Sequence, residues 1–278
     1  MLIEELKGIA PGLELGADGI WYAPQRVPIS YPEEGNLNCL ALEADSFWFE
    51  HRNQCIQALI ERFPAGGPLF DIGGGNGYVA MGLARAGIAA VLVEPGEGGA
   101  RNARQRGVDP VICATLQEAG FQPASLPAAS LFDVLEHIQD DAAFLSDLAG
   151  YLVPGGRVYL TVPAYGWLWS ADDDYAGHFR RYTLAQLGRV LRAAGLQIEF
   201  GTYIFTLLPA PIWLMRALPT RLGLRKQNEW DRYQQEHSSR PGLAGQLLNG
   251  LLRVELGWLK RGRSLPLGGS CLMVAKKV

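Results

Sequence analysis

The sequence contains little cysteine, with four residues in 278, at positions 39, 55, 113 and 271. No two of them form a Cys-x-x-Cys pair, and their wide separation argues against both a zinc site and a disulfide framework. We therefore expect no bound metal and a reducing, cytoplasmic compartment. The sequence also lacks internal repeats and low-complexity tracts. Its start is acidic and has no long apolar core, so no signal peptide is expected.

The charge is unevenly distributed along the chain. Residues 1–178 hold 9 Lys or Arg and 23 Asp or Glu, whereas residues 179–278 hold 16 and 5. A basic final third indicates an anionic partner, such as a phosphate, a nucleotide or a membrane surface. Ordinary solvated helix faces packed on an acidic core domain would give the same pattern. An apolar content of 48% supports a sizeable packed core.

The most informative segment is PLFDIGGGNG at 68–77. An apolar strand pattern ends in Asp71 and runs into glycines at 73, 75 and 77, and a helical pattern follows. Such glycines let the backbone approach a ligand at the carboxyl end of a central strand. A dinucleotide fingerprint, G-x-G-x-x-G, would put its third glycine at position 78, which is Tyr78.

A second apolar run, 88–93, ends in Glu94, nineteen residues after Gly75. A carboxylate in that position can accept hydrogen bonds from both ribose hydroxyls of an adenosine. Alternatively, Glu94 lies at a helix start, where an acidic side chain is stabilised by the helix dipole.

The G-x-G-x-G loop after Asp71 resembles motif I of the class I S-adenosylmethionine-dependent methyltransferases. The run LFDVLEHI at 131–138 resembles the fourth-strand motif of their small-molecule group (methyltransferase type 11/23-like), which is related to the methyltransferases of ubiquinone synthesis. The segment 148–157 matches the family's helix, Pro-Gly-Gly turn and fifth strand. The resemblance extends from Phe70 to about Thr206.

This resemblance implies an α/β, Rossmann-like fold: a doubly wound, seven-stranded, mostly parallel sheet in the order 3-2-1-4-5-7-6, with an antiparallel last strand. It also implies S-adenosyl-L-methionine as cofactor and S-adenosyl-L-homocysteine as product. The family usually places an acidic residue near position 115 to hold the adenine amino group. Cys113 and Thr115 do not supply one, so backbone groups and Leu116 are left for the adenine contact. The implied cofactor contacts are Asp71, Gly73, Gly74, Gly75, Asn76, Gly77, Glu94, Pro95, Thr115, Leu116, Asp133, Val134 and Leu135.

We expect four parts: an N-terminal segment with a lid helix (1–64, irregular to residue 40), the cofactor-binding core (65–206), a helical insertion (207–268) and the last core strand (269–278). In the family a short turn usually joins strands six and seven, but here about sixty-five residues separate them. Such a connection is too long for a bare loop. Its apolar start, 206–219, is too short and too interrupted by proline to span a bilayer.

One helical stripe of the insertion carries Leu243, Leu247, Leu251, Val254 and Trp258, and basic residues lie close by at 253, 260, 261 and 263. The stripe could form an amphipathic cap that covers a lipid-like substrate or rests on a membrane surface. Alternatively, it is buried in a helical subdomain or a dimer contact. Because amphipathic stripes usually face a core, the sequence favours burial.

A methyl group on a sulfonium is already activated, so the enzyme mainly aligns the reacting atoms. A base is needed where the acceptor is a hydroxyl or a protonated amine. The run GHFRRYT at 177–183 resembles a signature of bacterial methyltransferases of cell-envelope saccharide or lipid pathways. We predict His178 as this base, with His137 as its rival.

The candidate acceptor contacts are Trp48, Arg52, Trp169, Tyr175, Arg180, Arg181 and Tyr182. The two adjacent arginines could bind a phosphate or a carboxylate. Alternatively, they pair with the acidic residues at 172–174 and pin the loop, while Thr183 caps the next helix. The run SFWFEHRN at 46–53 resembles the same subgroup, and Trp48 and Arg52 could cover the methionine end of the cofactor.

We therefore expect a methyltransferase that acts on an O or N atom, or a C atom, of a small-molecule, saccharide or lipid-like acceptor that is anionic. Peripheral contact with the inner membrane surface and a homodimer stay open, and no specific nucleic acid is expected. An NAD(P)-dependent oxidoreductase is disfavoured by Tyr78 and by the lack of a Tyr-x-x-x-Lys pair. A non-catalytic cofactor-binding protein is disfavoured by the intact Asp71, Gly75 and Glu94.

Overall fold

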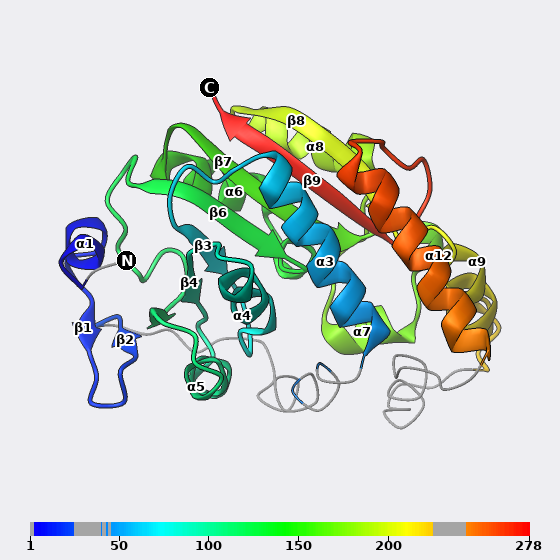
Figure 1. The fold of residues 1–278 in the computed structure, drawn as a ribbon, viewed down its shortest axis with the longest axis horizontal. Helices are drawn as coiled ribbons and strands as arrows, with labels where there is room; N and C mark the ends of the chain where they lie inside the picture. Colours follow the sequence, from blue (N-terminus) through cyan, green and yellow to red (C-terminus); the bar gives the residue numbers. More distant parts are fainter. Residues whose placement is uncertain (1–2, 25–39, 41–42, 44–45, 225–242) are drawn as a thin grey trace.

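The computed structural model describes residues 3–24, 40, 43, 46–224 and 243–278 (Figure 1). Within these residues, nine strands form one sheet. In sheet order they are β1 (Glu14–Leu15), β2 (Trp21–Tyr22), β5 (Val111–Cys113), β4 (Ala90–Val93), β3 (Leu69–Ile72), β6 (Leu126–Phe132), β7 (Leu152–Pro163), β9 (Ser270–Lys277) and β8 (Leu196–Ile204).

The seven strands from β5 to β8 have the predicted order 3-2-1-4-5-7-6, and β9 is antiparallel to both its neighbours, as predicted. The central strands β3 and β6 are buried at every position except the partly buried Pro127, which is why they appear as mostly apolar runs. Asp71 of β3 pairs in register with Leu92 of β4 and Ser130 of β6, so the predicted site lies at the middle of the sheet.

The prediction of an irregular N-terminal segment is wrong for residues 3–24. These residues form helix α1 (Ile3–Ile9) and the β1–β2 hairpin, and β2 adds to β5 in parallel, so the sheet has nine strands rather than seven. Two-residue strands are too short to give a periodic pattern. A tight turn closes the hairpin, with Asp18 Oδ1 accepting from the Ile20 N–H at 3.1 Å.

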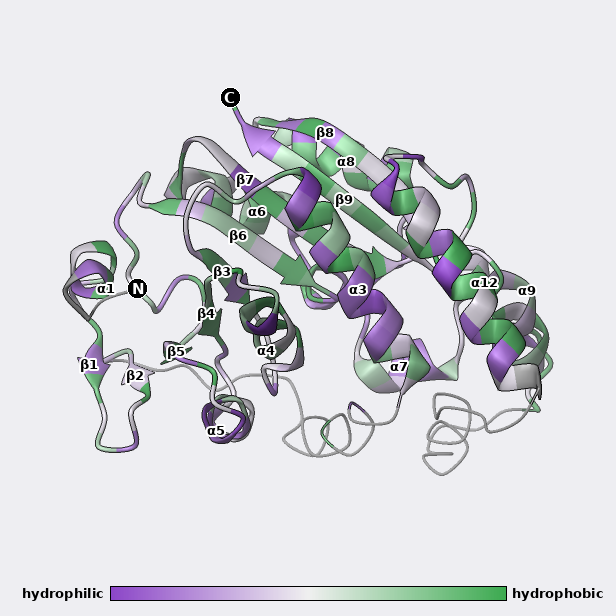
Figure 2. Ribbon diagram, viewed as in Figure 1, coloured by the Kyte–Doolittle hydropathy of each residue, from purple (hydrophilic) through white to green (hydrophobic). Residues whose placement is uncertain are grey.

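Helices cover both faces of the sheet, as in a doubly wound fold (Figure 1). One face packs against α3 (Phe47–Arg62), α4 (Tyr78–Arg85) and α12 (Leu243–Lys260), and the other against α6 (Asp141–Tyr151) and α8 (Leu184–Ala193). Figure 2 shows hydrophobic residues along the central strands and hydrophilic ones on α5 (Glu97–Gln105). The remaining short elements are α7 (Ala171–Ala176), α9 (Pro209–Ile212), α10 (Leu218–Arg221), the 3₁₀ turns η1 (Leu135–His137) and η2 (Gly166–Leu168), and the π turn η3 (Trp213–Ala217).

The insertion is helical in its described parts, but burial of the predicted α12 stripe within a helical subdomain is wrong, while its burial in a dimer contact stays a prediction. Leu247, Leu251, Val254 and Trp258 are 40 to 66% exposed. A second stripe, which the sequence analysis missed, packs on α3 instead, through the buried Leu252 and Leu259 and the partly buried Leu248 and Leu256. The side chain of Leu243, and parts of the predicted segments 1–64 and 207–268, lie outside the described residues.

Candidate active site

The glycine loop between β3 and α4 has the conformation that its composition requires. Gly73, Gly75 and Gly77 have φ values of +71°, +54° and +74°, in the left-handed region that glycine adopts at little cost. At Gly74 a Cβ atom would lie 2.2 Å from Leu92 Cδ1, whereas at Gly75 it would meet nothing within 4 Å. The backbone at Gly75 therefore faces open space that a ligand can enter.

Glu94 lies directly against this loop, at the end of β4. Its Oε2 accepts from the Gly75 N–H at 2.9 Å, and its Oε1 accepts from the Gly96 N–H at 2.8 Å. Burial raises the pKa of Glu94 to about 7, although both backbone donors act in the opposite direction. The carboxylate thus occupies the place expected of the ribose-binding group.

Asp71 and Asn76 hold the glycine loop in place through buried hydrogen bonds. Asp71 Oδ1 accepts from Ser130 Oγ at 2.8 Å, and burial raises the pKa of Asp71 to about 6, which Ser130 and Arg52 partly offset. The buried Asn76 accepts from Asn102 of α5 at 2.9 Å. These bonds hold the end of β3 and the start of α4 in place.

Thr115 and Leu116, the predicted adenine contacts, bond or pack within their own part of the fold. The Thr115 N–H donates to Glu118 at 2.9 Å, and Leu116 is 1% exposed in the core. The carbonyl of Pro95 accepts from the Cys113 thiol, with a sulfur–oxygen distance of 3.8 Å. Adenine binding by Thr115 and Leu116 stays a prediction.

The end of β6 reaches both the glycine loop and α3. Asp133 has a φ of +58° and pairs with Arg52 of α3. A Cβ atom at Gly73 would lie 2.8 Å from Val134, so the loop and the strand end are in close contact. Leu135 is buried behind them. Three predicted cofactor residues, Asp133, Val134 and Leu135, therefore lie next to the loop.

Glu136 and His137 follow these residues directly in the chain, and His178 lies beside His137. Glu136 is fully buried, and neither carboxyl oxygen has a hydrogen-bond partner within the described part of the chain. Burial and the nearby Asp133 raise the pKa of Glu136 well above its usual range. The rings of His137 and His178 lie 4.7 Å apart, edge to face. Burial, then repulsion by His178, lowers the pKa of His137 to about 4, which keeps this ring neutral.

Among the described residues, two groups of side chains could hold a metal ion, because in each the ligand atoms lie within 4.8 Å of one another. One consists of Glu136, His137 and His178, and the other of His51, Cys55 and Glu255. In the second group, Glu255 already bonds His51 and two backbone N–H groups. The absence of a metal stays a prediction.

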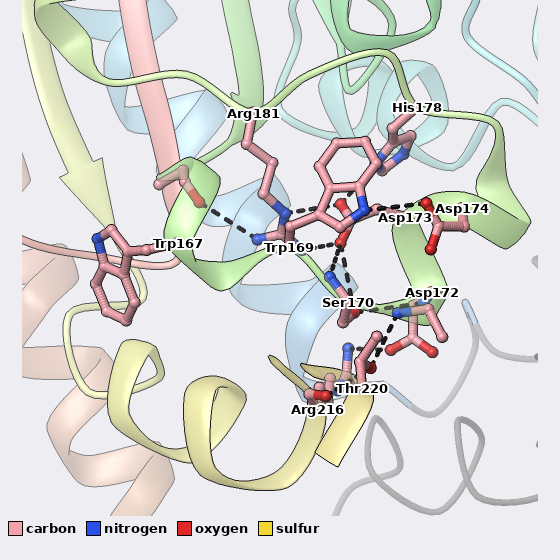
Figure 3. A network of polar contacts seen from close by, with 12 residues as sticks. Trp167, Trp169, Ser170, Asp172, Asp173, Asp174, His178, Arg181, Arg216 and Thr220 are labelled. Atoms are coloured by element: carbon pink, nitrogen blue, oxygen red, sulfur yellow. Dashed lines mark hydrogen bonds and ion pairs between the residues drawn. The ribbon is translucent and has the colours of Figure 1, made fainter. Parts of the chain in front are cut away.

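Asp173 organises the segment after β7 (Figure 3). Its Oδ1 bonds His178 Nδ1 at 2.9 Å and accepts from Arg181 Nε at 2.7 Å, while its Oδ2 accepts from Arg181 Nη2 at 2.9 Å. Burial opposes ionisation of Asp173, but His178 and Arg181 outweigh it and lower the pKa to about 2. Asp173 is therefore an ionised group that fixes the His178 ring.

Both predicted arginines are paired. Arg181 binds Asp173, which confirms the alternative that it pins the loop. Arg180 pairs instead with Asp141 at 2.8 Å. Tyr182 is 2% exposed and donates to the same Asp141 at 2.6 Å. Thr183 caps α8, as predicted, by accepting from the Gln186 N–H. Acceptor binding by these arginines stays a prediction.

The remaining predicted acceptor contacts are Trp48, Trp169 and Tyr175, and only some of them already have a partner among the described residues. Trp48 stacks on Phe205, with ring centroids 3.8 Å apart and an interplanar angle of 6°. Trp169 donates to Asp174 at 3.0 Å. Tyr175 is 48% exposed. Trp48 and Trp169 thus contribute packing or loop structure, and Tyr175 is accessible.

The insertion touches the segment that carries His178. Arg216 pairs with Asp172 at 3.4 Å, and Thr220 Oγ1 accepts from the Ala171 N–H at 3.2 Å (Figure 3). Arg221 donates to the Trp167 carbonyl at 3.0 Å. These contacts place η3 and α10 against η2 and the start of α7, the helix that precedes His178 in the chain.

No site role was predicted for Glu136 or Ser130, and Asp173 was expected only as one of the acidic residues at 172–174 that could pair with the two arginines. A usable signal existed for Asp173, because Ser170 and Asp173 have the spacing of a capping box, which the structure contains. Glu136 lies inside the recognised strand-end motif, but its burial depends on packing that the local sequence does not reveal.

Residues 48–199 match a family described as Methyltransferase domain. A probable S-adenosylmethionine-dependent methyltransferase of Mycolicibacterium smegmatis is 27% identical over 183 residues, which are 64% of this chain and 70% of the relative. A ubiquinone biosynthesis O-methyltransferase of Xanthomonas axonopodis is 28% identical over 167 residues, covering 53% and 69%.

Among solved structures, a possible histamine N-methyltransferase of Thermotoga maritima has a TM-score of 0.55 at 16% identity, covering 89% of this chain and all of that one. This likeness supports the fold alone. The family match spans more than half of the chain, and it agrees with the glycine loop and Glu94. This chain belongs to the methyltransferase domain family and is an S-adenosylmethionine-dependent methyltransferase.

Proposed function

We propose that this methyltransferase acts on a hydroxyl oxygen of a small, lipid-like, anionic acceptor and that His178 removes the hydroxyl proton. The bond of 2.9 Å between His178 Nδ1 and Asp173 carries this proposal. A ring that donates its Nδ1–H to an ionised carboxylate has its lone pair on Nε2, where it can accept a proton. The imidazolium that forms is stabilised by the same carboxylate.

His178 suits this role better than His137. Because the pKa of His137 is lowered to about 4, its ring is a weak base near neutral pH. In the reaction, the acceptor oxygen attacks the methyl carbon as the carbon–sulfur bond breaks. S-adenosyl-L-homocysteine leaves, and the hydroxyl proton passes to His178 Nε2.

The glycine loop at 73–77 and Glu94 would hold the adenosine part of the cofactor. The open space at Gly75 and the position of the Glu94 carboxylate, 2.9 Å from the Gly75 N–H, support this. Residues 133–135 would line the methyl-transfer site, because they lie at the end of the strand next to β3 and Val134 contacts Gly73 of the loop.

Two observations support the acceptor class. A relative is named as an O-methyltransferase of ubiquinone biosynthesis, which favours an oxygen atom. The described parts of the insertion, which contact the His178 segment, hold six Lys or Arg residues and one carboxylate, the buried Glu255. This excess of positive charge favours an anionic acceptor.

The test is methyl transfer from radiolabelled S-adenosylmethionine to three acceptors: a prenylated hydroxybenzoate, a prenylated phenol that lacks the carboxylate, and a sugar phosphate. We expect turnover with at least one prenylated compound. His178→Gln should lower that turnover by about a hundredfold or more while leaving cofactor affinity within about twofold.

His137→Gln serves as the matched control, and its turnover should fall much less. A His178→Gln enzyme with normal turnover would rule out the base assignment. A larger loss in His137→Gln than in His178→Gln would move the role to His137. Turnover with the sugar phosphate alone would contradict the lipid-like acceptor.

A further inference from the structure

Helix α12 carries apolar residues on two separate faces. Leu252 and Leu259 are 4% and 2% exposed and pack toward α3, whereas Leu247 and Val254 are 66% and 52% exposed. We call the four exposed residues Leu247, Leu251, Val254 and Trp258 the α12 stripe. Its spacings of four, three and four residues place all of its members on one side of the helix. None of the described residues covers this stripe, so it is in contact with solvent.

The rotation of α12 about its axis is fixed, so the stripe cannot turn inward. Glu255 lies on the buried face, and its carboxylate accepts from the Phe205 and Thr206 N–H groups, each at 2.7 Å. The same carboxylate bonds His51 of α3 at 2.8 Å. Turning the stripe toward the core would remove this buried carboxylate from three partners.

Positive charge lies at the C-terminal end of the stripe. Lys260, Arg261 and Arg263 follow within five residues of Trp258, and all three are exposed. Arg253 is exposed on the helix itself, and the one carboxylate of α12 is the buried Glu255. A tryptophan and aliphatic residues beside lysine and arginine are typical of helices that lie in the interface of an anionic bilayer.

We propose that the α12 stripe and its basic C-terminal end bind the surface of an anionic lipid bilayer, with α12 parallel to the membrane plane. None of the described helices has the length and apolarity needed to cross a membrane. The proposal goes beyond methyl transfer, because vesicle binding requires neither cofactor nor acceptor. A bilayer suits both the apolar stripe and the basic end of α12. Its acyl chains can contact the stripe, and its phosphate groups can bind the lysine and arginine side chains.

The experiment is cosedimentation of the full chain with vesicles of phosphatidylcholine plus phosphatidylglycerol, and with vesicles of phosphatidylcholine alone. We expect binding to the anionic vesicles that weakens as salt is raised, because exposed charges are screened. Leu251→Asn with Val254→Asn should weaken it by about tenfold or more, and so should Lys260→Gln with Arg261→Gln and Arg263→Gln.

The matched control is Leu15→Asn with Val278→Asn, which replaces a leucine and a valine that are 49% and 87% exposed outside the insertion. Its vesicle affinity should stay within about twofold of the unmodified chain. Thermal unfolding and cofactor titration check that each variant is folded. If the stripe variant does not fold, quenching by brominated lipids, compared between the native chain and Trp258→Phe, gives the same information.

Three outcomes would overturn the proposal: no binding to anionic vesicles, equal binding to neutral ones, or stripe and control variants that bind alike. If the chain does not bind vesicles but forms a dimer that the stripe variant abolishes, the stripe binds a second copy of the chain instead. Methyl transfer to a soluble acceptor is measured separately, so failure of vesicle binding leaves the proposed reaction standing.

Discussion

Arg52 of α3 pairs with Asp133 at the end of β6, so the helix that precedes β3 is tied to the strand end beside the glycine loop. The Arg52 side chain is 10% exposed and that of Asp133 is 26% exposed. Asp133 also has a left-handed backbone, with a φ of +58°. A non-glycine residue in that region is strained, and a strong partner helps to hold it there.

Replacing Arg52 should therefore destabilise the fold. Arg52→Met leaves the Asp133 carboxylate without its cation, and we expect the free energy of unfolding to fall by about 1–3 kcal/mol, since Asp133 is only partly buried. Urea denaturation measures this. The control is Arg101→Met, which breaks an exposed pair with Glu97 and should cost no more than about 0.5 kcal/mol. Equal costs would contradict the structural role of Arg52.

Comparing Gly75→Ala with Gly66→Ala should distinguish a loss of cofactor binding from the cost of backbone strain. Gly75 and Gly66 both have positive φ values, +54° and +75°, and at neither would a Cβ atom meet anything within 4 Å. Both alanine variants should thus lose similar stability, about 1 kcal/mol. Only Gly75→Ala should weaken S-adenosylmethionine binding, by about tenfold, measured by calorimetry. Equal affinities in the two variants would show that the cofactor does not approach Gly75.

Cofactor affinity should depend on the ionisation of Glu94. Its pKa is raised to about 7, and an ionised carboxylate accepts ribose hydroxyl bonds better than a protonated one. Affinity should therefore rise with pH, by about tenfold between pH 6 and pH 8. The matched variant is Glu94→Gln, which cannot ionise. A variant with the same pH dependence as the native chain would show that another group is responsible.

The raised pKa of Glu94 has the opposite pH dependence for the stability of the cofactor-free chain, which should fall as pH rises. Because the folded pKa of Glu94 lies above its usual 4.5, the folded state holds the proton more tightly than the unfolded state. Stability from this group is complete below pH 4.5 and is lost as pH rises through 7. The melting temperature of Glu94→Gln relative to that of the native chain should therefore increase across this window. A constant difference would contradict the raised pKa.

Glu255→Gln should loosen α12 from the core. Burial opposes ionisation of Glu255, but bonds from His51 and Thr206 outweigh it and lower its pKa below the usual 4.5. The loss should be about 1–3 kcal/mol near neutral pH. It should shrink as pH falls below 4.5, where the native carboxylate also takes up a proton. Glu50→Gln, on the exposed face of α3, is the control and should change stability by no more than about 0.5 kcal/mol.

The resemblance to the methyltransferase family supplied the sheet order, which apolar runs alone do not determine. The residue pattern itself was sufficient for the strands, because buried parallel strands appear as apolar runs, and for the place of Glu94, because the spacing from Gly75 to Glu94 reflects one strand–helix–strand unit. It was insufficient for the pairing of Arg180 and Arg181. Both arginines lie near several carboxylates, and only the folded path of the chain brings Asp141 to one and Asp173 to the other.

The wrong prediction for α12 has a different cause. This helix has two apolar stripes, and periodicity alone does not indicate which of them faces the core. The deciding residue is Glu255, whose three partners come from the distant residues His51, Phe205 and Thr206. A single carboxylate within a mostly apolar helix is a signal that could have been used, because such a group requires partners if it is buried.

The β1–β2 hairpin has a consequence for solubility. Without it, the short strand β5, which is wholly buried, would be outermost and would offer unpaired N–H and C=O groups to other molecules. With β2 paired to β5, the sheet ends instead at a two-residue strand that contains the exposed Glu14. A strand so short and charged is a poor template for further pairing, so the hairpin protects this margin of the enzyme against edge-to-edge aggregation.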